Sequence, residues 1–305
     1  MLLSIGDQAK PGNYRFHSRF DRVVNFEHEG RLLAVVDESI GPGPLNIVLR
    51  DLRRSHATAS LPPSDSLLQI TSRTVWFAGC HYHFTARHRY SSTLDLPPID
   101  LPCFLRNLST LGELLGEAAP PKSLAFLVDA QRRKHFRAGF ERAFADQITF
   151  GVHQVFHGHL LQGIRRLKGC GLGLTPAGDD FIAGFLIGLH LFEKLRGQNA
   201  QPTTDAVFRA AHGQNIFSNT FLDLARRGLL SGHMKDLLLA LVSGSEGSVR
   251  RATRKLFTIG ETSGADLATG LFLTLQGLLR QPGGQSRNSS REAVFTTAHF
   301  ATPHS

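Results

Sequence analysis

The sequence predicts an α+β protein, in which a small N-terminal antiparallel β barrel or sandwich is followed by a mainly α-helical domain. Three observations predict this fold class. Short apolar runs separated by turn residues fill the early part of the chain, a cluster of prolines follows, and apolar residues then recur at helical spacing. We therefore expect a β domain at residues 1–96, a helical domain at 97–280 that carries the Gly-rich and Asp motifs, and a mobile tail at 281–305.

The expected strands are rich in Val, Ile, Phe and Leu, and they lie at 15–27, 31–37, 45–50, 67–71 and 74–84. Strands this close together, with no helical period between them, favour an antiparallel barrel or sandwich. The tight, rigid segment Gly41-Pro42-Gly43-Pro44 is interpreted first as a hairpin connection and second as part of a functional site.

Prolines mark the change to helical structure, at Pro97-Pro98, Pro102 and Pro120-Pro121. Beyond them the apolar spacing predicts helices at 103–118, 130–146, 152–167, 178–196, 204–212, 217–230, 233–242, 246–257 and 265–280. From Gln281 onward the chain is rich in Gly, Ser, Arg and Asn with little periodicity, which favours a mobile tail.

Composition bounds the function. The formal net charge is +9, but 25 acidic residues are interspersed with the basic ones, so anionic metabolites or an acidic partner subunit fit as well as nucleic acid. The three cysteines are odd in number and in no metal-ligand spacing, which favours a reducing cytoplasm over a disulfide framework or a zinc site. The chain start does not match a signal peptide, and no apolar run reaches the roughly 20 residues that a membrane span needs. We expect a soluble protein.

A glycine-dense loop runs into an apolar segment at residues 169–188. Its first three glycines allow positive φ or close approach to a ligand, and Thr175-Pro176 supplies a cap hydroxyl and a proline suited to a first helical turn. Asp179 and Asp180 follow in the first turn or two, where the helix dipole favours negative charge. The positions four and eight after Asp180 are glycine, so one helix face is bare and a second element can approach it.

A second copy of this pattern lies at residues 263–270, which align without a gap on 177–184. Both copies read small residue, Gly, any residue, Asp, three residues, Gly. Both follow a threonine, Thr175 or Thr262, and both precede an apolar helix. Capped helix starts reuse the same few residues, so coincidence is one explanation, but we favour two related functional starts.

The Gly-rich loop does not fit two familiar nucleotide-binding patterns. It lacks the Gly-Lys-Ser/Thr ending of a P-loop, and it follows an expected helix instead of the strand that a dinucleotide fingerprint requires. What remains is a general anion site, in which free backbone NH groups at a helix start face a ligand. Arg165, Arg166 and Lys168 could supply counter-charge; the alternative is a solvated face, which we favour for Arg166 alone.

The acidic residues are electrostatically unfavourable for an anion site. Asp179, Asp180 and Asp266 would repel a phosphate unless a divalent cation lies between them or they accept hydrogen bonds from an NH2 group. A carbamoyl or amide group offers such donors. Alternatively, Asp180 and Asp266 only cap their own helices, which explains the spacing equally well but explains the repeat less well.

Other candidates carry weaker signals. His153 and His157 are four apart on one helix face, but no third metal ligand is evident, so ordinary surface or core histidines are favoured. Cys170 has no base that can be assigned, so a small loop residue is favoured over a nucleophile. A basic helix face that we expect to be solvated is formed by Arg250, Arg251, Arg254 and Lys255.

Three ordered blocks of residues carry a resemblance to a known family. They are Gly-x-Gly-Leu-Thr-Pro-x-x-Asp-Asp at 171–180, Asn215-Ile216-Phe217-Ser218 with Leu222, Ala225 and Gly228, and Gly260-x-Thr262-Ser263-Gly264-Ala265-Asp266. These blocks resemble the AllH type of oxamate carbamoyltransferase subunit. The Gly-Pro-Gly segment at 41–43 is similar to an N-terminal segment of that family, so the resemblance spans roughly residues 15 to 280.

The resemblance implies one subunit of a three-subunit enzyme of anaerobic allantoin breakdown, a branch of purine metabolism. That enzyme interconverts oxalurate plus phosphate with oxamate plus carbamoyl phosphate. Related sets of subunits occur beside genes of other or unknown function, so this chain could instead act on a different carbamoyl or acyl substrate. The implied partners are these small anionic substrates and two other subunits, with no membrane. No redox cofactor is required, and Mg²⁺ is compatible.

We place the site where the two repeated helix starts converge, with their glycine faces allowing close approach. Asp179, Asp180 and Asp266 are the expected catalytic residues. Asp180 and Asp266 would orient nitrogen or bind Mg²⁺. The expected ligand-binding positions are Gly171, Gly173, Thr175, Gly178, Ser218, Thr262, Ser263 and Gly264.

Two other classes of function compete with this one. A non-catalytic scaffold subunit would use its glycine motifs to pack helices and its positive charge to dock acidic partners. An RNA-binding protein would use residues 250–255 and the basic tail, with an affinity that falls steeply with salt. We rank nucleic acid last, because basic and aromatic residues interleave poorly.

Overall fold

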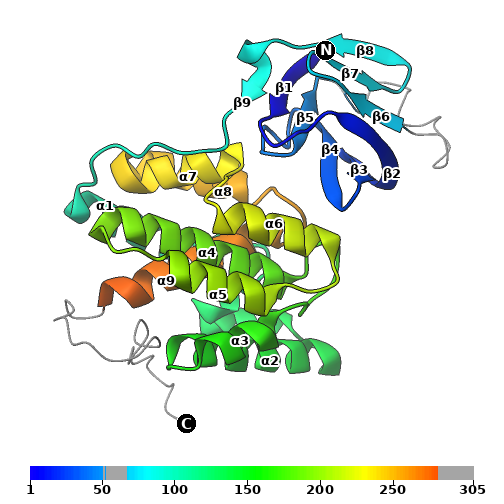
Figure 1. The fold of residues 1–305 in the computed structure, drawn as a ribbon. Coiled ribbons are helices and arrows are strands. Elements are labelled where there is room, and N and C mark those ends of the chain that lie inside the picture. Colours follow the sequence, from blue (N-terminus) through cyan, green and yellow to red (C-terminus); the bar gives the residue numbers. More distant parts are fainter. Residues whose placement is uncertain (51, 53–66, 281–305) are drawn as a thin grey trace. The chain divides into compact units, whose positions relative to one another are not determined.

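The computed structural model describes residues 1–50, 52 and 67–280, which form two compact units. The first unit contains Met1–Leu96 together with Gly228–Leu238, and the second contains Pro97–Arg227 and the chain from Leu239 onward. The fold is mixed α+β, with a sheet first and helices after it, as the sequence predicts (Figure 1). The tail expected at 281–305 lies outside the described residues.

The first unit is built on one nine-stranded sheet with the order β8-β7-β6-β2-β3-β4-β5-β1-β9. Two neighbouring pairs are parallel, β4 with β5 and β1 with β9, and the other pairs are antiparallel. The strands are β1 (Leu2–Gly6), β2 (Gly12–Phe20), β3 (Val23–His28), β4 (Arg31–Asp37), β5 (Asn46–Leu49), β6 (Leu67–Ile70), β7 (Thr74–Phe77), β8 (Cys80–His83) and β9 (Arg89–Tyr90).

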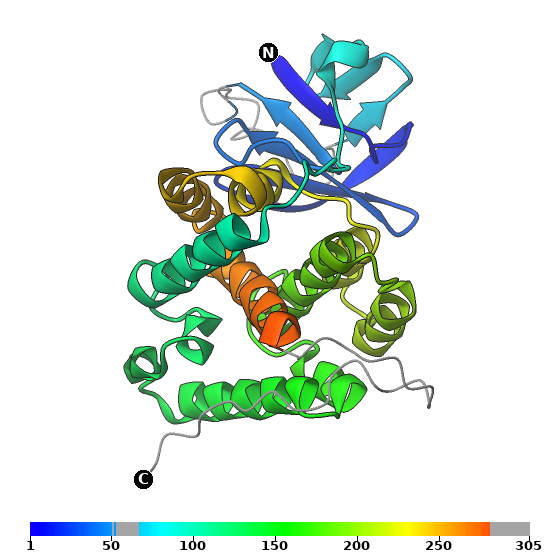
Figure 2. The same ribbon diagram turned by 90° about the vertical axis from the view of Figure 1, so that its left-hand side faces the viewer.

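This sheet curls into a half-barrel that does not close, so the predicted closed barrel or two-sheet sandwich is wrong (Figure 2). Closing a barrel requires the two edge strands to pair along their length. The edge strands β8 and β9 have only four and two residues, and the side chains of β8 are mostly exposed. The curled sheet instead surrounds one apolar core, which includes Phe26, Ile47 and Leu68.

The predicted strands agree with the structure where turn residues are clear. The strand at 31–37 is confirmed as β4, and the strands at 45–50 and 67–71 match β5 and β6 to within one residue at each end. The run at 15–27 is two strands, β2 and β3, and the run at 74–84 is the hairpin of β7 and β8. Strands β1 and β9 were not expected from the sequence.

The segment Gly41-Pro42-Gly43-Pro44 is not a hairpin connection, because the strands that it joins, β4 and β5, run parallel. Two backbone hydrogen bonds hold the segment. The NH of Gln8 donates to the Pro44 carbonyl at 3.0 Å, and the NH of Gly232 donates to the Pro42 carbonyl at 2.8 Å. The segment is therefore a packed corner of the first unit.

Helices follow the sheet in the chain. They are α1 (Leu101–Glu117), α2 (Gly139–Phe156), α3 (Leu160–Leu167), α4 (Ala177–Arg196), α5 (Gln201–Ala211), α6 (Ile216–Arg226), α7 (Gly232–Ser243), α8 (Glu246–Leu256) and α9 (Ser263–Arg280). Short 3-10 helices are η2 (Ala86–His88), η3 (Leu124–Leu127) and η4 (Ala130–His135). Within the described ranges, no helix combines the length and the apolar character needed to span a membrane.

Two predicted helices, 130–146 and 152–167, are wrong in their boundaries, because one helix, α2, covers the end of the first and the beginning of the second. The carboxylate of Glu141 accepts the NH groups of Arg137 and Ala138 at 2.8 and 2.9 Å, which fixes the start of α2 at Gly139. Gly158, at φ 85°, ends it. The other predicted helices agree with α1 and α4 to α9 to within four residues at each end.

Helices α4 and α9 make the most extensive helix-to-helix contact in the described part of the chain. A Cβ added to Gly184 would lie 2.0 Å from the Leu267 carbonyl oxygen, and one added to Gly188 would lie 2.8 Å from the Thr274 Cβ. The contacts advance in the same direction along both helices, so α4 and α9 run parallel. Their first turns therefore lie side by side.

The contact between α4 and α9 is reciprocal. A Cβ on Gly270 would lie 2.1 Å from the Phe181 carbonyl oxygen, and one on Gly184 would lie 2.0 Å from the Leu267 carbonyl oxygen. In the sequence repeat, Gly184 aligns with Gly270 and Phe181 aligns with Leu267. Equivalent residues thus make equivalent contacts, which is the signature of a local two-fold relation between the two helix starts.

We expect Gly184→Ala to lower the free energy of unfolding by about 1–3 kcal/mol, because its Cβ cannot be accommodated without moving α9. Gly116→Ala is the matched control. Gly116 lies in the last turn of α1, and a Cβ there would have its nearest neighbour, the Asp129 Cβ, at 3.8 Å. The control should be neutral or stabilising by up to about 1 kcal/mol. Urea unfolding measures both, and equal stability of the two variants would contradict the packing described.

Candidate functional site

The Gly-rich loop between α3 and α4 takes the backbone geometry that the sequence predicts. Gly169, Gly171 and Gly173 have φ angles of 70°, 120° and 98°. A Cβ on Gly171 would also lie 2.7 Å from the backbone nitrogen of Ala177. The backbone NH groups of residues 171–175 have no hydrogen-bond partner in the described part of the chain. The loop therefore offers several free donors beside the start of a helix.

Asp179 and Asn215 hold this loop in place. One carboxylate oxygen of Asp179 accepts the Gly169 NH at 2.8 Å, and the other accepts the Ser218 hydroxyl at 2.6 Å. The Asn215 side chain caps α6 and donates to the Leu174 carbonyl at 2.8 Å. Both oxygens of Asp179 are thus engaged inside the chain, and Asp179 and Ser218 join the loop to α6.

A hydroxyl-carboxyl cluster forms where the two helix starts meet. The Thr175 hydroxyl lies 3.3 Å from one carboxyl oxygen of Asp180 and 3.4 Å from the Ser263 hydroxyl on α9. The Thr262 carbonyl accepts the NH groups of Ala265 and Asp266, each at 2.9 Å, and so begins α9. The two copies of the repeat therefore place polar side chains against each other, 88 residues apart in sequence.

Asp266 lies deepest in this centre, with none of its surface exposed. One carboxyl oxygen accepts the Leu124 backbone NH at 2.6 Å, and the other has no hydrogen-bond partner within the described residues. Burial raises the pKa of Asp266 to about 7, although the Leu124 NH and the neighbouring Thr262 hydroxyl oppose the rise. Asp266 therefore keeps its proton to a higher pH than an ordinary aspartate does.

Asp180 is the carboxyl of the cluster that solvent reaches, since it is only partly buried by surface area. Desolvation raises the pKa of Asp180 well above its usual range, and the nearby Asp266 and Asp179 raise it further. The hydroxyls of Ser263 and Thr175 favour the ionised form but do not offset these effects. Asp180 therefore holds a proton more readily than an ordinary aspartate, and in its neutral form it can donate as well as accept a hydrogen bond.

The remaining predicted ligand positions are mostly packing residues. A Cβ on Gly178 would lie 2.0 Å from the Leu167 carbonyl oxygen, and one on Gly264 would lie 1.9 Å from the Leu256 carbonyl oxygen. These glycines let each helix start approach the end of the preceding helix, α3 or α8. The structure thus brings Thr175, Asp180 and Ser263 together. Gly178 and Gly264 instead pack against the ends of α3 and α8.

The weaker candidates lie outside this cluster. Cys170 accepts a hydrogen bond from Gln147 at 2.9 Å, and burial followed by the nearby Asp179 raises the pKa of its thiol, which makes it a poor nucleophile. The rings of His153 and His157 stack with centroids 3.8 Å apart. Within residues 1–50, 52 and 67–280, no group of three or more His, Cys, Asp or Glu is placed to hold a metal ion.

Sequence reasoning missed two contributors to the site. Asn215 belongs to the sequence block at 215–218 but was not among the expected site residues. An Asn before an apolar run is nevertheless a recognisable helix cap. The backbone NH of Leu124 gave no sequence signal, because its bond to Asp266 joins residues 142 positions apart.

The pH dependence of stability should reveal the buried Asp266. Its pKa is raised on folding, so it stabilises the folded state fully below about pH 4, and this contribution is lost as the pH rises through about 7. Relative to Asp266→Asn, wild-type stability should fall by up to about 1.4 kcal/mol per pH unit across that window. Urea unfolding of both proteins between about pH 5 and 8 measures the difference, and a difference that does not change with pH would contradict a raised pKa.

Comparisons with known proteins bear on the same residues. No curated protein matches the chain. No solved structure matches it either. A protein-family model does match, over a stretch that runs from the end of α3 into α9 and contains the Gly-rich loop, the Asn215 cap and both helix starts. Residues 167–275 match the family of the oxamate carbamoyltransferase subunit AllH, which confirms the resemblance over this stretch and leaves the segment at 41–44 outside it.

Proposed function

We propose that this chain is a subunit of a carbamoyltransferase that interconverts oxalurate plus phosphate with oxamate plus carbamoyl phosphate, or transfers a related carbamoyl or acyl group. The observation that supports it most is the convergence of the repeated helix starts of α4 and α9, within the stretch that matches the AllH family. The family is described as a subunit of an enzyme, which supports the proposal that this chain assembles with partner subunits. We expect two of them.

The pairing of Asp180 with a carbamoyl group explains why an acid lies here. A neutral carboxyl group presents one donor and one acceptor side by side, and so does a primary amide. The two can form a pair of parallel hydrogen bonds. Thr175 and Ser263, which lie at the cluster, supply further hydroxyls for the carbonyl oxygen as it gains negative charge.

The Gly-rich loop is suited to the phosphate half of the reaction. Its free NH groups at residues 171–175 lie beside the start of α4, where the helix dipole favours an anion. A neutral Asp180 removes the repulsion that an ionised carboxylate would exert on phosphate. The site then needs no cation to bring the acid and the phosphate together, although Mg²⁺ stays compatible with it.

In the proposed forward reaction, the amide nitrogen of oxamate attacks the carbamoyl carbon of carbamoyl phosphate. A carbon–nitrogen bond forms, the bond from that carbon to the phosphate oxygen breaks, and the phosphate leaves with the proton that the nitrogen loses. Protein groups contribute by holding the two substrates together and by stabilising the tetrahedral intermediate, and neither contribution needs a redox cofactor.

A non-catalytic scaffold subunit is the second candidate. It is favoured by the internal engagement of Asp179, whose two oxygens bind Gly169 and Ser218, and by the complete burial of Asp266. In that case the glycines serve only to bring α3, α4, α8 and α9 together, and the reacting groups belong to another subunit.

Ligand-dependent thermal stability separates these functions. We expect carbamoyl phosphate or oxalurate to raise the melting temperature of the wild-type protein, because a ligand that binds only the folded state stabilises it. Asp180→Ala should abolish that rise. Asp180→Asn, which keeps a neutral donor and acceptor, should retain much of it and should lose the decline that the wild type shows as the pH rises and Asp180 ionises.

Glu261→Gln is the matched control, because Glu261 is an exposed acid in the loop just before α9. It should respond to the ligands like the wild type. An equal rise in wild type and Asp180→Ala would place the site elsewhere. The absence of any rise, both in the isolated chain and in the chain assembled with its partner subunits, would favour the scaffold function.

A further inference from the structure

A basic surface on α3 and α5 contains two adjoining hollows, of about 320 and 540 Å³. Both are lined by Arg165 and Lys168 at the end of α3. The first also has Arg209 of α5, and the second has Arg166 with the amide side chains of Gln147 and Gln162. No carboxylate of the described residues lines either hollow, so we call the two together the basic hollow.

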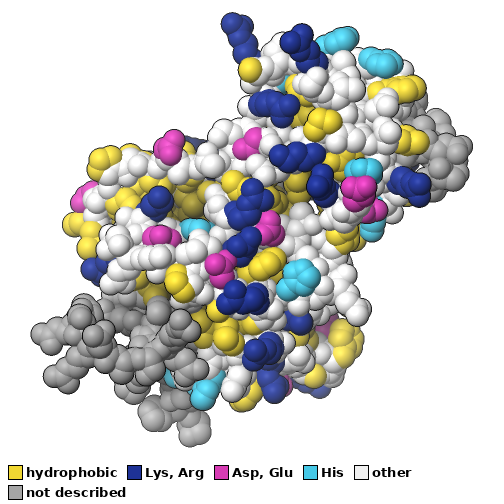
Figure 3. Space-filling model, viewed as in Figure 1, with side chains coloured by type: hydrophobic (Ala, Val, Ile, Leu, Met, Phe, Trp, Pro, Cys, Tyr) yellow, Lys and Arg dark blue, Asp and Glu magenta, His cyan; other side chains and the backbone are white. Residues whose placement is uncertain are grey.

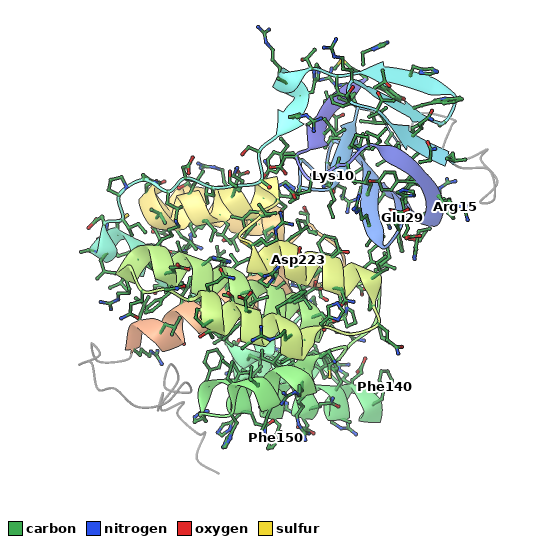
Figure 4. The ribbon with its side chains drawn as sticks, viewed as in Figure 1. Lys10, Arg15, Glu29, Phe140, Phe150 and Asp223 are labelled. Atoms are coloured by element: carbon green, nitrogen blue, oxygen red, sulfur yellow. The ribbon has the colours of Figure 1, made fainter. Side chains whose placement is uncertain are left out.

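The cations of the basic hollow are not all committed to partners. Lys168 donates to the His212 carbonyl at 3.0 Å. The guanidinium of Arg166 lies over the ring of Phe150 of α2, 4.6 Å from its centre, and Figure 4 labels Phe150. Arg165 and Arg209 are exposed and make no ion pair within the described residues. Two guanidinium groups are therefore available to a ligand.

One acid, Asp205, lies one turn before Arg209 on α5. Its carboxylate forms its ion pair with Arg226 of α6, at 2.8 Å, and attracts Arg209 only more weakly and without forming an ion pair. Arg226 also pairs with Asp223 at 2.7 Å, which Figure 4 labels on α6. The acids of α5 and α6 are thus occupied by Arg226, and the face that carries α3, α5 and α6 shows several Lys and Arg side chains (Figure 3).

The basic hollow is distinct from the hydroxyl-carboxyl cluster. None of Thr175, Asp180, Ser263 and Asp266 lines it. The two places are joined through the backbone, because Lys168 is the residue before Gly169, whose NH binds Asp179. An anion held by Lys168 would therefore lie next to the base of the Gly-rich loop.

We propose that the basic hollow binds a small molecule that carries one or more phosphoryl groups. Guanidinium forks bind phosphoryl oxygens in pairs, and the two glutamine amides supply neutral donors. The first hollow is also lined by the apolar residues Leu161, Ala206 and Ala210. This apolar part of the lining suits a compact ligand. RNA fits less well, because among the described residues no aromatic side chain lines the hollows. This inference does not depend on the proposed function.

Calorimetric titration of the full-length chain with pyrophosphate, inorganic phosphate and a short single-stranded RNA tests the proposal. Pyrophosphate should bind saturably, and the double variant Arg165→Gln with Arg209→Gln should weaken its binding roughly tenfold or more, because two charge-assisted contacts are lost. The matched control is Arg251→Gln with Arg254→Gln, which removes the same charge from exposed arginines of α8. That control should bind pyrophosphate like the wild type.

Several results would overturn the proposal. If both double variants weakened pyrophosphate binding equally, the effect would come from the overall charge of the protein and not from a specific site. Absence of saturable binding to pyrophosphate and to phosphate would remove the site. RNA binding that is tighter than pyrophosphate binding, falls steeply with salt and is lost in the Arg165 and Arg209 variant would make the surface a nucleic-acid site instead. Because these residues are exposed, unchanged melting temperatures should show that both double variants are folded.

Discussion

The close contact between the backbones of α4 and α9 is the constraint on which the rest of the helical unit depends. Gly184 and Gly270 each face a carbonyl oxygen of the opposite helix at a distance that no side chain could occupy. Glycine loses more conformational entropy on folding than other residues, so its presence inside two helices is unfavourable unless it permits such packing. The packing in turn sets the two first turns side by side, which brings the Thr175 and Ser263 hydroxyls together at the candidate site.

The convergence of two acidic helix starts raises the question of how their charge is tolerated. Asp180 and Asp266 lie close together, Asp266 is fully buried, and the contacts described for the two carboxyls come from hydroxyls and a backbone NH instead of from Lys or Arg. Ionising both would leave two like charges in a region of low dielectric constant, which is costly. The raised pKa values of both carboxyls instead favour their neutral, protonated forms. Neutral acids suit an amide ligand, and they lower the barrier to binding a phosphate nearby.

The elements with local signals could be predicted from the sequence. The Gly-rich loop and both helix starts have a composition that fixes their backbone, and the repeat indicated that they would meet. The break between α2 and α3 was missed because the apolar spacing continues through it, while Gly158 and the Glu141 cap decide the boundaries. Closure of the sheet could not be predicted, because no local pattern says whether the first and last strands of a ladder meet.

The roles of individual site residues divide in the same way. Asp179 and Asp180 are neighbours in sequence and look equivalent, yet one joins the loop to α6 and the other faces α9. Because consecutive residues of a helix point in different directions, the two side chains meet different partners. Those partners lie far away in the chain. The Leu124 NH that binds Asp266 is similarly set by tertiary structure alone.

The central claim is that the two repeated helix starts form one binding centre. The most direct test is to record the backbone amide NMR signals of the labelled full-length protein while carbamoyl phosphate or oxamate is added. We expect the signals from residues 171–180 and from residues 260–266 to shift together, with one saturation curve. Shifts confined to only one of these segments, or found in neither while other parts of the chain respond, would contradict it.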